Sequence, residues 1–204
     1  MKNGKKVGII GGTFNPIHIG HLILAESAYD EYKLDEILFI PTGISHFKDP
    51  SIVLDKKKRI SMTGGAIDDN PHFALSTIET DRPGNSYTYE TLEELKRVNP
   101  DNEYYLIIGA DSLFQMEEWK EPQSIMNNAV ILVAVRKGQS LEDLQAKADE
   151  LIKKYNADIR VLKCHYIDIS STEIRQRIKE GKSIRYMVTL NTREYIEKNG
   201  LYKD

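Results

Sequence analysis

The sequence of 204 residues has little cysteine, little net charge and no long apolar run. Its single cysteine, Cys164, excludes an internal disulfide and lacks the cysteine partners of a zinc site. With 28 Lys and Arg against 31 Asp and Glu, the net charge of -3 provides no global basic field for nucleic acid. The first apolar run, Val7 to Ile10, is too short for a signal peptide or a membrane span. These absences favour a cytoplasmic protein with no nucleic-acid partner and no membrane partner.

Short apolar runs alternate with amphipathic stretches along the chain, which is the pattern of βα units and a parallel sheet. Runs rich in Val, Ile and Leu predict strands buried on both faces, at Lys6–Ile10, Glu36–Ile40, Phe73–Ile78, Tyr104–Ile108, Ala129–Val135 and Asp158–Leu162. Apolar residues at helical spacing predict helices over His21–Tyr32, Tyr89–Val98, Leu141–Tyr155, Ser171–Lys179 and Thr192–Lys198. We expect an α/β fold, a doubly wound parallel sheet in one domain over residues 1–204, with a C-terminal helical portion over 170–204.

The segment GGTFNPIHIGH, which begins at Gly11, directly follows the first predicted strand. In a doubly wound sheet, ligands bind beyond the carboxyl ends of the strands, where such loops lie. Gly11 and Gly12 lack Cβ atoms and would let a phosphate approach the backbone. A helix that begins near Ile19 would add free N–H groups and a positive dipole end. His18 and His21 would share one helical face and stabilise charge on a transferred phosphate.

Other interpretations of this segment exist. Glycines between a strand and a helix are often only turn residues, and two histidines at this spacing could be half of a metal site. No cluster of Asp, Glu or Cys supplies further ligands nearby in the sequence. The dinucleotide fingerprint G-x-G-x-x-G is absent, because the glycines fall at positions 8, 11 and 12. A redox enzyme of the Rossmann type is therefore disfavoured.

A second phosphate-binding candidate is the segment DISSTEIRQRI near the other end of the chain. Ser170 precedes Glu173 by three residues, the spacing of a capping box at the start of a helix. Ser171 and Thr172 add hydroxyls at the same helix end, and Arg175 follows within the first turns. Backbone amides and a guanidinium could together hold a triphosphate there. Taken alone, the segment is no more than a good helix N-cap.

GGTFNPIHIGH resembles the GGTF(D/N)PxHxGH signature of the nucleotidyltransferase superfamily, and in particular of the bacterial nicotinate mononucleotide adenylyltransferases. DISSTEIRQRI is similar to the ISSTxIR element, and GNSYTYETL to the SYTY turn of that family. The ending SIRYMVTLNTREYIEKNGLY resembles the family's C-terminus, which the smaller phosphopantetheine adenylyltransferases lack. The resemblance covers almost the whole chain. It implies adenylyl transfer from ATP to nicotinate mononucleotide in NAD biosynthesis, with Mg²⁺ carried by ATP and no metal held by the protein.

The resemblance also implies roles for individual residues. His18 and His21 would be catalytic, and the remaining contacts to ATP and its phosphates would come from Gly11, Gly12, Thr13, Phe14, Ser170, Ser171, Thr172, Arg175, Gly109 and Asp111. The only tryptophan, Trp119, would stack on the nicotinate ring, and backbone near Thr88 would meet the pyridine carboxylate. Without the resemblance, Trp119 is a partly buried surface aromatic and SYTY a turn before a helix.

Two positions depart from the family pattern. Where the family often has PPHK, this chain reads PTGISHFKDP, with Phe47 at the histidine position. His46 or Lys48 could supply the contact to nicotinate mononucleotide instead. Lys120 follows Trp119 where an aromatic residue is common, and its ammonium would attract the acid form of the substrate.

Several alternatives stay open on the sequence. The acceptor could be nicotinamide mononucleotide or another phosphate such as phosphopantetheine, and the chain could be a nucleotide sensor without catalysis. RNA binding through the basic run 56–59 is a further alternative, although such a run is usually a solvated helix face. The sequence is compatible with a homo-oligomer. Gly64 and Gly65 interrupt an otherwise helical stretch and have no clear structural role.

Overall fold

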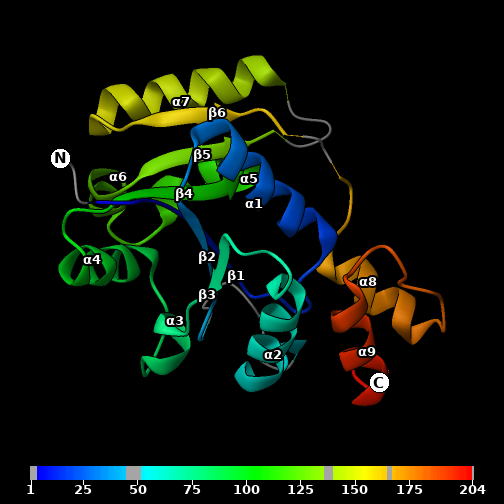
Figure 1. The fold of residues 1–204 in the computed structure, drawn as a ribbon. Helices are drawn as coiled ribbons and strands as arrows, with labels where there is room; N and C mark the ends of the chain where they lie inside the picture. The colour runs from blue at the N-terminus through cyan, green and yellow to red at the C-terminus, as the bar shows by residue number, and fades with distance from the viewer. Residues whose placement is uncertain (1–3, 45–51, 136–139, 165–166, 204) are drawn as a thin grey trace.

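The fold is that of a computed structural model, which describes residues 4–44, 52–135, 140–164 and 167–203 (Figure 1). Within these residues one six-stranded sheet is formed by β1 (Lys6–Gly12), β2 (Glu36–Pro41), β3 (Phe73–Leu75), β4 (Glu103–Gly109), β5 (Val130–Ala134) and β6 (Ile159–Leu162). The strand order is β3-β2-β1-β4-β5-β6, and every neighbouring pair is parallel. This is the order of a doubly wound sheet, so the predicted fold class is confirmed.

Helices cover both faces of the sheet and enclose two apolar cores. The first core includes residues of α1 (Ile19–Tyr32), α2 (Lys56–Ile67), α8 (Ser171–Lys179) and α9 (Leu190–Lys198). The second core includes residues of α4 (Thr88–Val98), α5 (Ala110–Phe114), α6 (Pro122–Asn128) and α7 (Leu141–Tyr155). Consecutive strand residues point to opposite faces, so Ile10 packs in the first core and Ile9 in the second. In Figure 1 the C-terminal helix α9 (red) lies beside α2.

The helix ends follow the signals in the sequence. Ser170 is the N-cap of α8, and its Oγ accepts a hydrogen bond from the backbone N–H of Glu173 at 3.1 Å. Helix α9 ends at Lys198 with Asn199 as its C-cap residue, and Gly200 has a positive φ of 58°, which is common for a glycine after a helix. The predicted N-cap of α8 at Ser170 is confirmed.

The predicted strand over 73–78 is wrong at its C-terminal half. The strand ends at Leu75, and α3 (Ile78–Asp81) begins where the sixth strand residue was expected. Ser76 Oγ accepts from the N–H of Ile78 at 3.5 Å, and Thr80 Oγ1 donates to the carbonyl of Thr77 at 2.9 Å. Such local side-chain bonds to the backbone compete with the ladder of a strand.

The glycine pair at 64–65 does not interrupt a helix, because α2 runs through both residues. A Cβ on Gly64 would lie 3.5 Å from a side-chain carbon of Leu75, and one on Gly65 would lie 3.5 Å from Cβ of Asn191. Asn191 Nδ2 also donates to the carbonyl of Gly65 at 2.9 Å. Tertiary packing against β3 and α9 therefore outweighs the low helix propensity of glycine.

The position of the site follows from the sheet topology. The strand order reverses between β1 and β4, and the carboxyl ends of these two neighbouring strands carry Gly11, Gly12 and Gly109. Ligands of doubly wound sheets bind at such a switch point. A short 3₁₀ helix, η2 (Met116–Glu118), follows α5 beside it. Across the described ranges, no helix has the length and apolar character needed to cross a membrane.

Candidate active site

A cleft of about 490 Å³, here called the first cleft, opens at the carboxyl ends of β1 and β4. It is lined by most of the residues expected at the phosphates, together with both histidines. These residues are Gly11, Thr13, His18, His21, Gly109, Asp111, Ser170, Ser171, Thr172 and Arg175. Trp119, which was expected at the nicotinate ring, lines the first cleft as well. Two motifs separated by about three quarters of the chain therefore border the same space.

His18 and His21 lie against each other at the start of α1. His18 is the N-cap residue, so it flanks the helix rather than lying within it, and it is only 8% exposed. The two rings are stacked with centroids 3.7 Å apart and an interplanar angle of 28°. The backbone N–H of His18 donates to His21 Nδ1 at 3.2 Å, so a neutral His21 carries its ring proton on Nε2.

Phe14 supports the histidines from within the first core. It is 2% exposed, and its ring meets that of His21 edge-on at 5.1 Å between centroids. It lines neither the first cleft nor the second cleft described below. Its backbone has a φ of 47°, a left-handed conformation that is uncommon for a residue with a side chain. The phenyl ring thus packs against His21.

The two sequence motifs are hydrogen-bonded to each other. Ser171 Oγ donates to the carbonyl of Pro16 at 2.8 Å, and Arg175 Nη1 donates to the carbonyl of Asn15 at 2.8 Å. Arg175 Nη2 also donates to Thr172 Oγ1 at 3.2 Å. The N-terminus of α8 is therefore anchored directly to the loop after β1, and both contribute to one wall of the first cleft.

Arg59 holds the same loop from the other side, a role that sequence analysis missed. It is 2% exposed, although the basic run to which it belongs was expected to be a solvated helix face. Its guanidinium donates to the carbonyls of Thr13 at 2.9 Å, Gly43 at 3.2 Å and Leu54 at 3.0 Å. Burial lowers the pKa of Arg59. The expectation of a solvated helix face was therefore wrong at Arg59. Its neighbours in the basic run 56–59 are all lysines and give no sign that it is buried.

A second cleft, of about 290 Å³, adjoins the first. Three residues of the predicted set, Gly12, Thr88 and Lys120, line this second cleft only. The two clefts share a wall that includes Gly11, Thr13, Ser112 and Trp119. Residues assigned to ATP and residues assigned to the pyridine mononucleotide thus fall largely into two neighbouring spaces. Ser112 belongs to no motif, and no sequence signal indicates its position.

Trp119 and Lys120 lie where the second cleft meets α4. The indole of Trp119 packs partly against the second core. Lys120 Nζ lies 4.3 Å from the ring centroid of Tyr87 and 5.7 Å from that of Tyr89. Both distances are within the range of a cation–π contact, which holds the ammonium at the rim of the cleft.

The turn that carries Trp119 is tied to α7 by ion pairs. Glu117 of η2 accepts from Lys147 Nζ at 2.7 Å and from Lys154 Nζ at 2.6 Å. The hydrogen bonds from these two lysines lower the pKa of Glu117 to about 2. Surface ion pairs of this kind contribute modestly to stability, and here they fix the start of a functional turn.

Two predicted residues, His46 and Lys48, lie outside the residues that the structure describes. In the part of the chain it does cover, no group of three or more His, Cys, Asp and Glu side chains is arranged to hold a metal ion. Glu79 and Ser86, which were not singled out from the sequence, line the second cleft.

Comparison with known proteins agrees with this geometry. A cytidylyltransferase-like family model matches residues 9–177. A protein of Lachnoclostridium phytofermentans named "Probable nicotinate-nucleotide adenylyltransferase" is 46% identical over 198 residues, which cover 97% of this chain and 99% of that protein. A protein of Clostridium tetani with the same name is 39% identical over 199 residues, which cover 98% of this chain and 100% of that protein.

Solved structures share the fold. The structure titled "Plasmodium falciparum nicotinic acid mononucleotide adenylyltransferase complexed with NaAD" superposes with a TM-score of 0.80, covering 97% of each chain at 19% identity. A second structure of that protein, complexed with APC, superposes with a TM-score of 0.78. At this identity the likeness supports the fold alone.

Fold, clefts and family model together define the class, a nucleotidyltransferase of the cytidylyltransferase-like type. Identities of 46% and 39% over nearly the whole chain narrow this class. The chain belongs to the nicotinate-nucleotide adenylyltransferase family. The family and the enzyme class that the motifs predicted are confirmed.

Proposed function

We propose that this protein transfers the adenylyl group of ATP to nicotinate mononucleotide, giving nicotinate adenine dinucleotide and pyrophosphate in NAD biosynthesis. The observation that carries the proposal is the pair of clefts with a common wall at the switch point of the sheet. One cleft suits a triphosphate and the other a flat ring. Membership of the family supports the same pair of substrates.

ATP would occupy the first cleft. A Cβ on Gly11 would meet nothing within 4 Å, so the backbone there is open to a phosphate. The N-terminus of α8 adds backbone N–H groups and a positive dipole end to the same cleft. The side chains proposed to hold phosphate oxygens are those of Thr13, Ser171, Thr172 and Arg175, and Asp111 is proposed to hold a ribose hydroxyl.

Nicotinate mononucleotide would occupy the second cleft. The indole of Trp119 offers a π-face to the pyridine ring, and the backbone at Thr88 would donate to the carboxylate. Lys120 adds a positive charge at the rim. His46 and Lys48 are proposed to contact the mononucleotide from the segment that follows β2.

The reaction is an in-line substitution at the α-phosphorus of ATP. A 5′-phosphate oxygen of the mononucleotide forms a new P–O bond, while the bond to the oxygen that bridges the α- and β-phosphates breaks and its electron pair leaves with pyrophosphate. His18 and His21 would donate hydrogen bonds to the oxygens on which negative charge develops. No protein side chain becomes covalently attached. Mg²⁺ would enter with the triphosphate and neutralise part of its charge.

Pyrophosphate release tests this proposal directly. Purified protein is supplied with ATP and Mg²⁺, together with nicotinate mononucleotide, nicotinamide mononucleotide or phosphopantetheine. We expect a strong preference for the first acceptor. A preference for nicotinamide mononucleotide or phosphopantetheine would identify a different acceptor for the same adenylyl transfer. ATP binding without pyrophosphate release from all three would instead support a nucleotide sensor.

Three further proposals complete this assignment. Residues 1–204 would form one nucleotidyltransferase domain, because both cores wrap the same sheet. The protein would act in the cytoplasm, where ATP is made and where a chain with one cysteine needs no oxidising compartment. A homo-oligomer is compatible with the proposal and not required by it, and sedimentation would settle the oligomeric state.

A further inference from the structure

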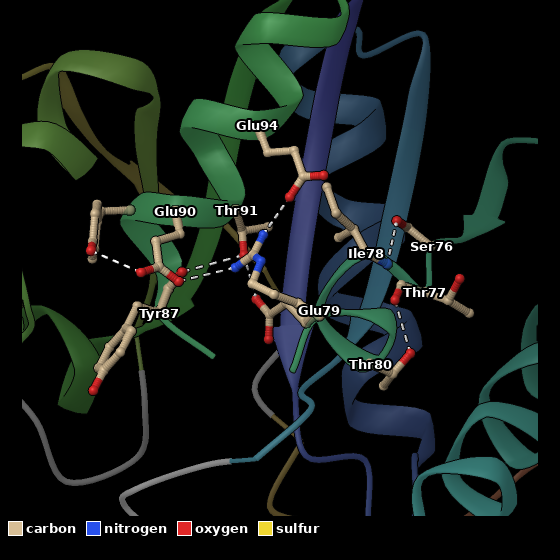
Figure 2. Close-up of polar contacts among 11 residues, drawn as sticks. Ser76, Thr77, Ile78, Glu79, Thr80, Tyr87, Glu90, Thr91 and Glu94 are labelled. Carbon is tan, nitrogen blue, oxygen red and sulfur yellow. Dashed lines mark hydrogen bonds and ion pairs between the residues drawn. The ribbon is translucent and has the colours of Figure 1, made fainter. Parts of the chain in front are cut away.

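A buried carboxyl group lies in the wall of the second cleft and has no part in the reaction proposed above. Glu79 belongs to α3, is 8% exposed, and lines this cleft together with Ser86, Thr88 and Thr91. Figure 2 shows Glu79 and Thr91 facing each other across the gap between α3 and α4. Burial of a carboxylate is costly unless hydrogen bonds compensate for lost water.

A hydroxyl group supplies that compensation. Thr91 Oγ1 donates to Glu79 Oε1 at 3.0 Å, and Thr91 itself is 2% exposed. Ser86 lines the same cleft, and its Oγ accepts from the backbone N–H of Gly43 at 3.0 Å.

These contacts join three chain segments around one carboxylate. Gly43 follows β2, Ser86 lies in the loop before α4, and Thr91 lies in the first turns of α4. A Cβ on Gly43 would lie 2.5 Å from the carbonyl oxygen of Glu79, so these backbones are in close contact. Thr88, the first residue of α4, lies between Ser86 and Thr91 in the sequence. The contacts on the two sides of Thr88 join it to the segment after β2 and to α3.

A separate set of ion pairs joins the same helices at a more exposed position. Arg82 pairs with Glu90 at 3.3 Å and with Glu94 at 2.6 Å, and Figure 2 shows these ion pairs. The carboxylate of Glu94 is 38% exposed and does not line the second cleft. These outer ion pairs join α3 to α4 without Glu79. Holding the two helices together therefore does not explain why a carboxyl group is buried at the cleft.

We propose that Glu79 is a positioning residue, whose carboxylate holds Thr91 and so sets Thr88 in place to bind the pyridine mononucleotide. The inference rests on the proposed function, because it requires that the second cleft takes this substrate. Glu79 acts through Thr88 and does not contact the reacting atoms. Its loss weakens binding of the mononucleotide and leaves binding of ATP in the first cleft unchanged.

Substitutions of graded severity test this role. Glu79→Gln keeps the size of the side chain and one acceptor oxygen but removes the charge, which weakens the hydrogen bond from Thr91. We expect the KM for nicotinate mononucleotide to rise about fivefold, with the KM for ATP changed by less than about twofold. Glu79→Ala removes the acceptor altogether, and we expect a rise of about 25-fold in the same constant.

Thr91→Val and the double variant show whether Glu79 acts through Thr91. Both single changes remove the same hydrogen bond, so their effects on the KM for the mononucleotide should combine to less than the product of the two. Glu94→Gln is the matched control, because it is the same substitution in the outer set of contacts. The control should leave both KM values within about twofold of wild type.

The outcomes separate this inference from the proposed function. Equal rises in both KM values, a fall in kcat alone, or the same effect from Glu94→Gln would show that Glu79 is merely structural. If wild type releases no pyrophosphate with any acceptor, the proposed function fails. Calorimetric titration of wild type and Glu79→Gln with nicotinate mononucleotide and with ATP then tests Glu79 on its own. A wild type that binds no pyridine mononucleotide would overturn the inference as well.

Discussion

The first and second clefts share a wall but are built differently. The first is bordered by two continuous motifs, the loop after β1 and the start of α8, which hydrogen-bond directly to each other. The second is assembled from β1, α3, α4 and the turn after η2, around a buried carboxyl group. Phosphates need amides and small donors, which a short motif can supply. Recognition of a flat ring with one charge requires side chains that only the tertiary fold brings together.

The largest expected effect concerns the chemistry at the first cleft. His21→Ala removes a hydrogen-bond donor at the developing charge, and we expect kcat to fall about a hundredfold or more. His72→Ala is a matched control, since His72 lies on the surface against Tyr29. Steady-state pyrophosphate release and thermal unfolding of both variants measure the effect. A His21→Ala enzyme within about tenfold of wild type would contradict a catalytic role.

Trp119 tests the stacking surface of the second cleft. Trp119→Ala should raise the KM for nicotinate mononucleotide by about 10- to 100-fold, because stacking on an aromatic side chain contributes about 1–3 kcal/mol per ring. Trp119→Phe keeps a π-face and should recover most of the affinity. The same kinetic assay, repeated with the concentration of ATP varied, measures the KM for ATP and so compares the effects on the two clefts. A larger rise in the KM for ATP would assign the indole to the first cleft.

Lys120 tests the charge at the rim of the second cleft. Lys120→Met should lower the ratio of kcat/KM for the acid over the amide mononucleotide by about fivefold, since an exposed charge contributes about 1 kcal/mol. Lys96→Met is the control, because Lys96 Nζ also lies over a tyrosine ring, that of Tyr104, at 5.5 Å, and lines neither cleft. An unchanged ratio in the Lys120 variant would mean that backbone groups alone select the acid.

The smallest expected effect is a pH dependence of stability from Glu79. Burial raises the pKa of Glu79 above 4.5, and hydrogen bonds from Thr91 and Ser86 and the charge of Arg82 oppose this rise. The folded state therefore holds the proton more tightly than the unfolded state. The stabilising contribution of Glu79 is complete below the unfolded pKa and is lost as the pH rises through the folded pKa.

Denaturant unfolding of wild type and Glu79→Gln from acid to neutral pH measures this contribution. The glutamine variant should gain stability relative to wild type as the pH rises above 4.5. A difference that does not change with pH would mean that the Glu79 pKa is the same in both states. If Glu79→Gln gains stability and also has a raised KM for nicotinate mononucleotide, the charge of Glu79 lowers the stability of the protein while improving recognition of this substrate.

The sheet and the first cleft could be predicted from the sequence because both rest on local patterns. Apolar runs located all six strands, and Ser170 indicated the start of α8. The end of β3 at Leu75 was not predicted, because the hydroxyls of Ser76 and Thr80 that bond to nearby backbone there leave no signal in the apolar pattern. Arg59 and Glu79 were missed because burial of a charged side chain depends on distant partners, which no local pattern records.

The common wall of the clefts, which includes Gly11 and Trp119, has a consequence for the dinucleotide. In the proposed reaction each substrate would occupy one of the two clefts, whereas the product carries both halves in one molecule. Once one half is bound, the other is held at a high effective concentration beside its own cleft. The product should therefore leave more slowly than either substrate, and its departure rather than bond formation would then limit the rate of turnover.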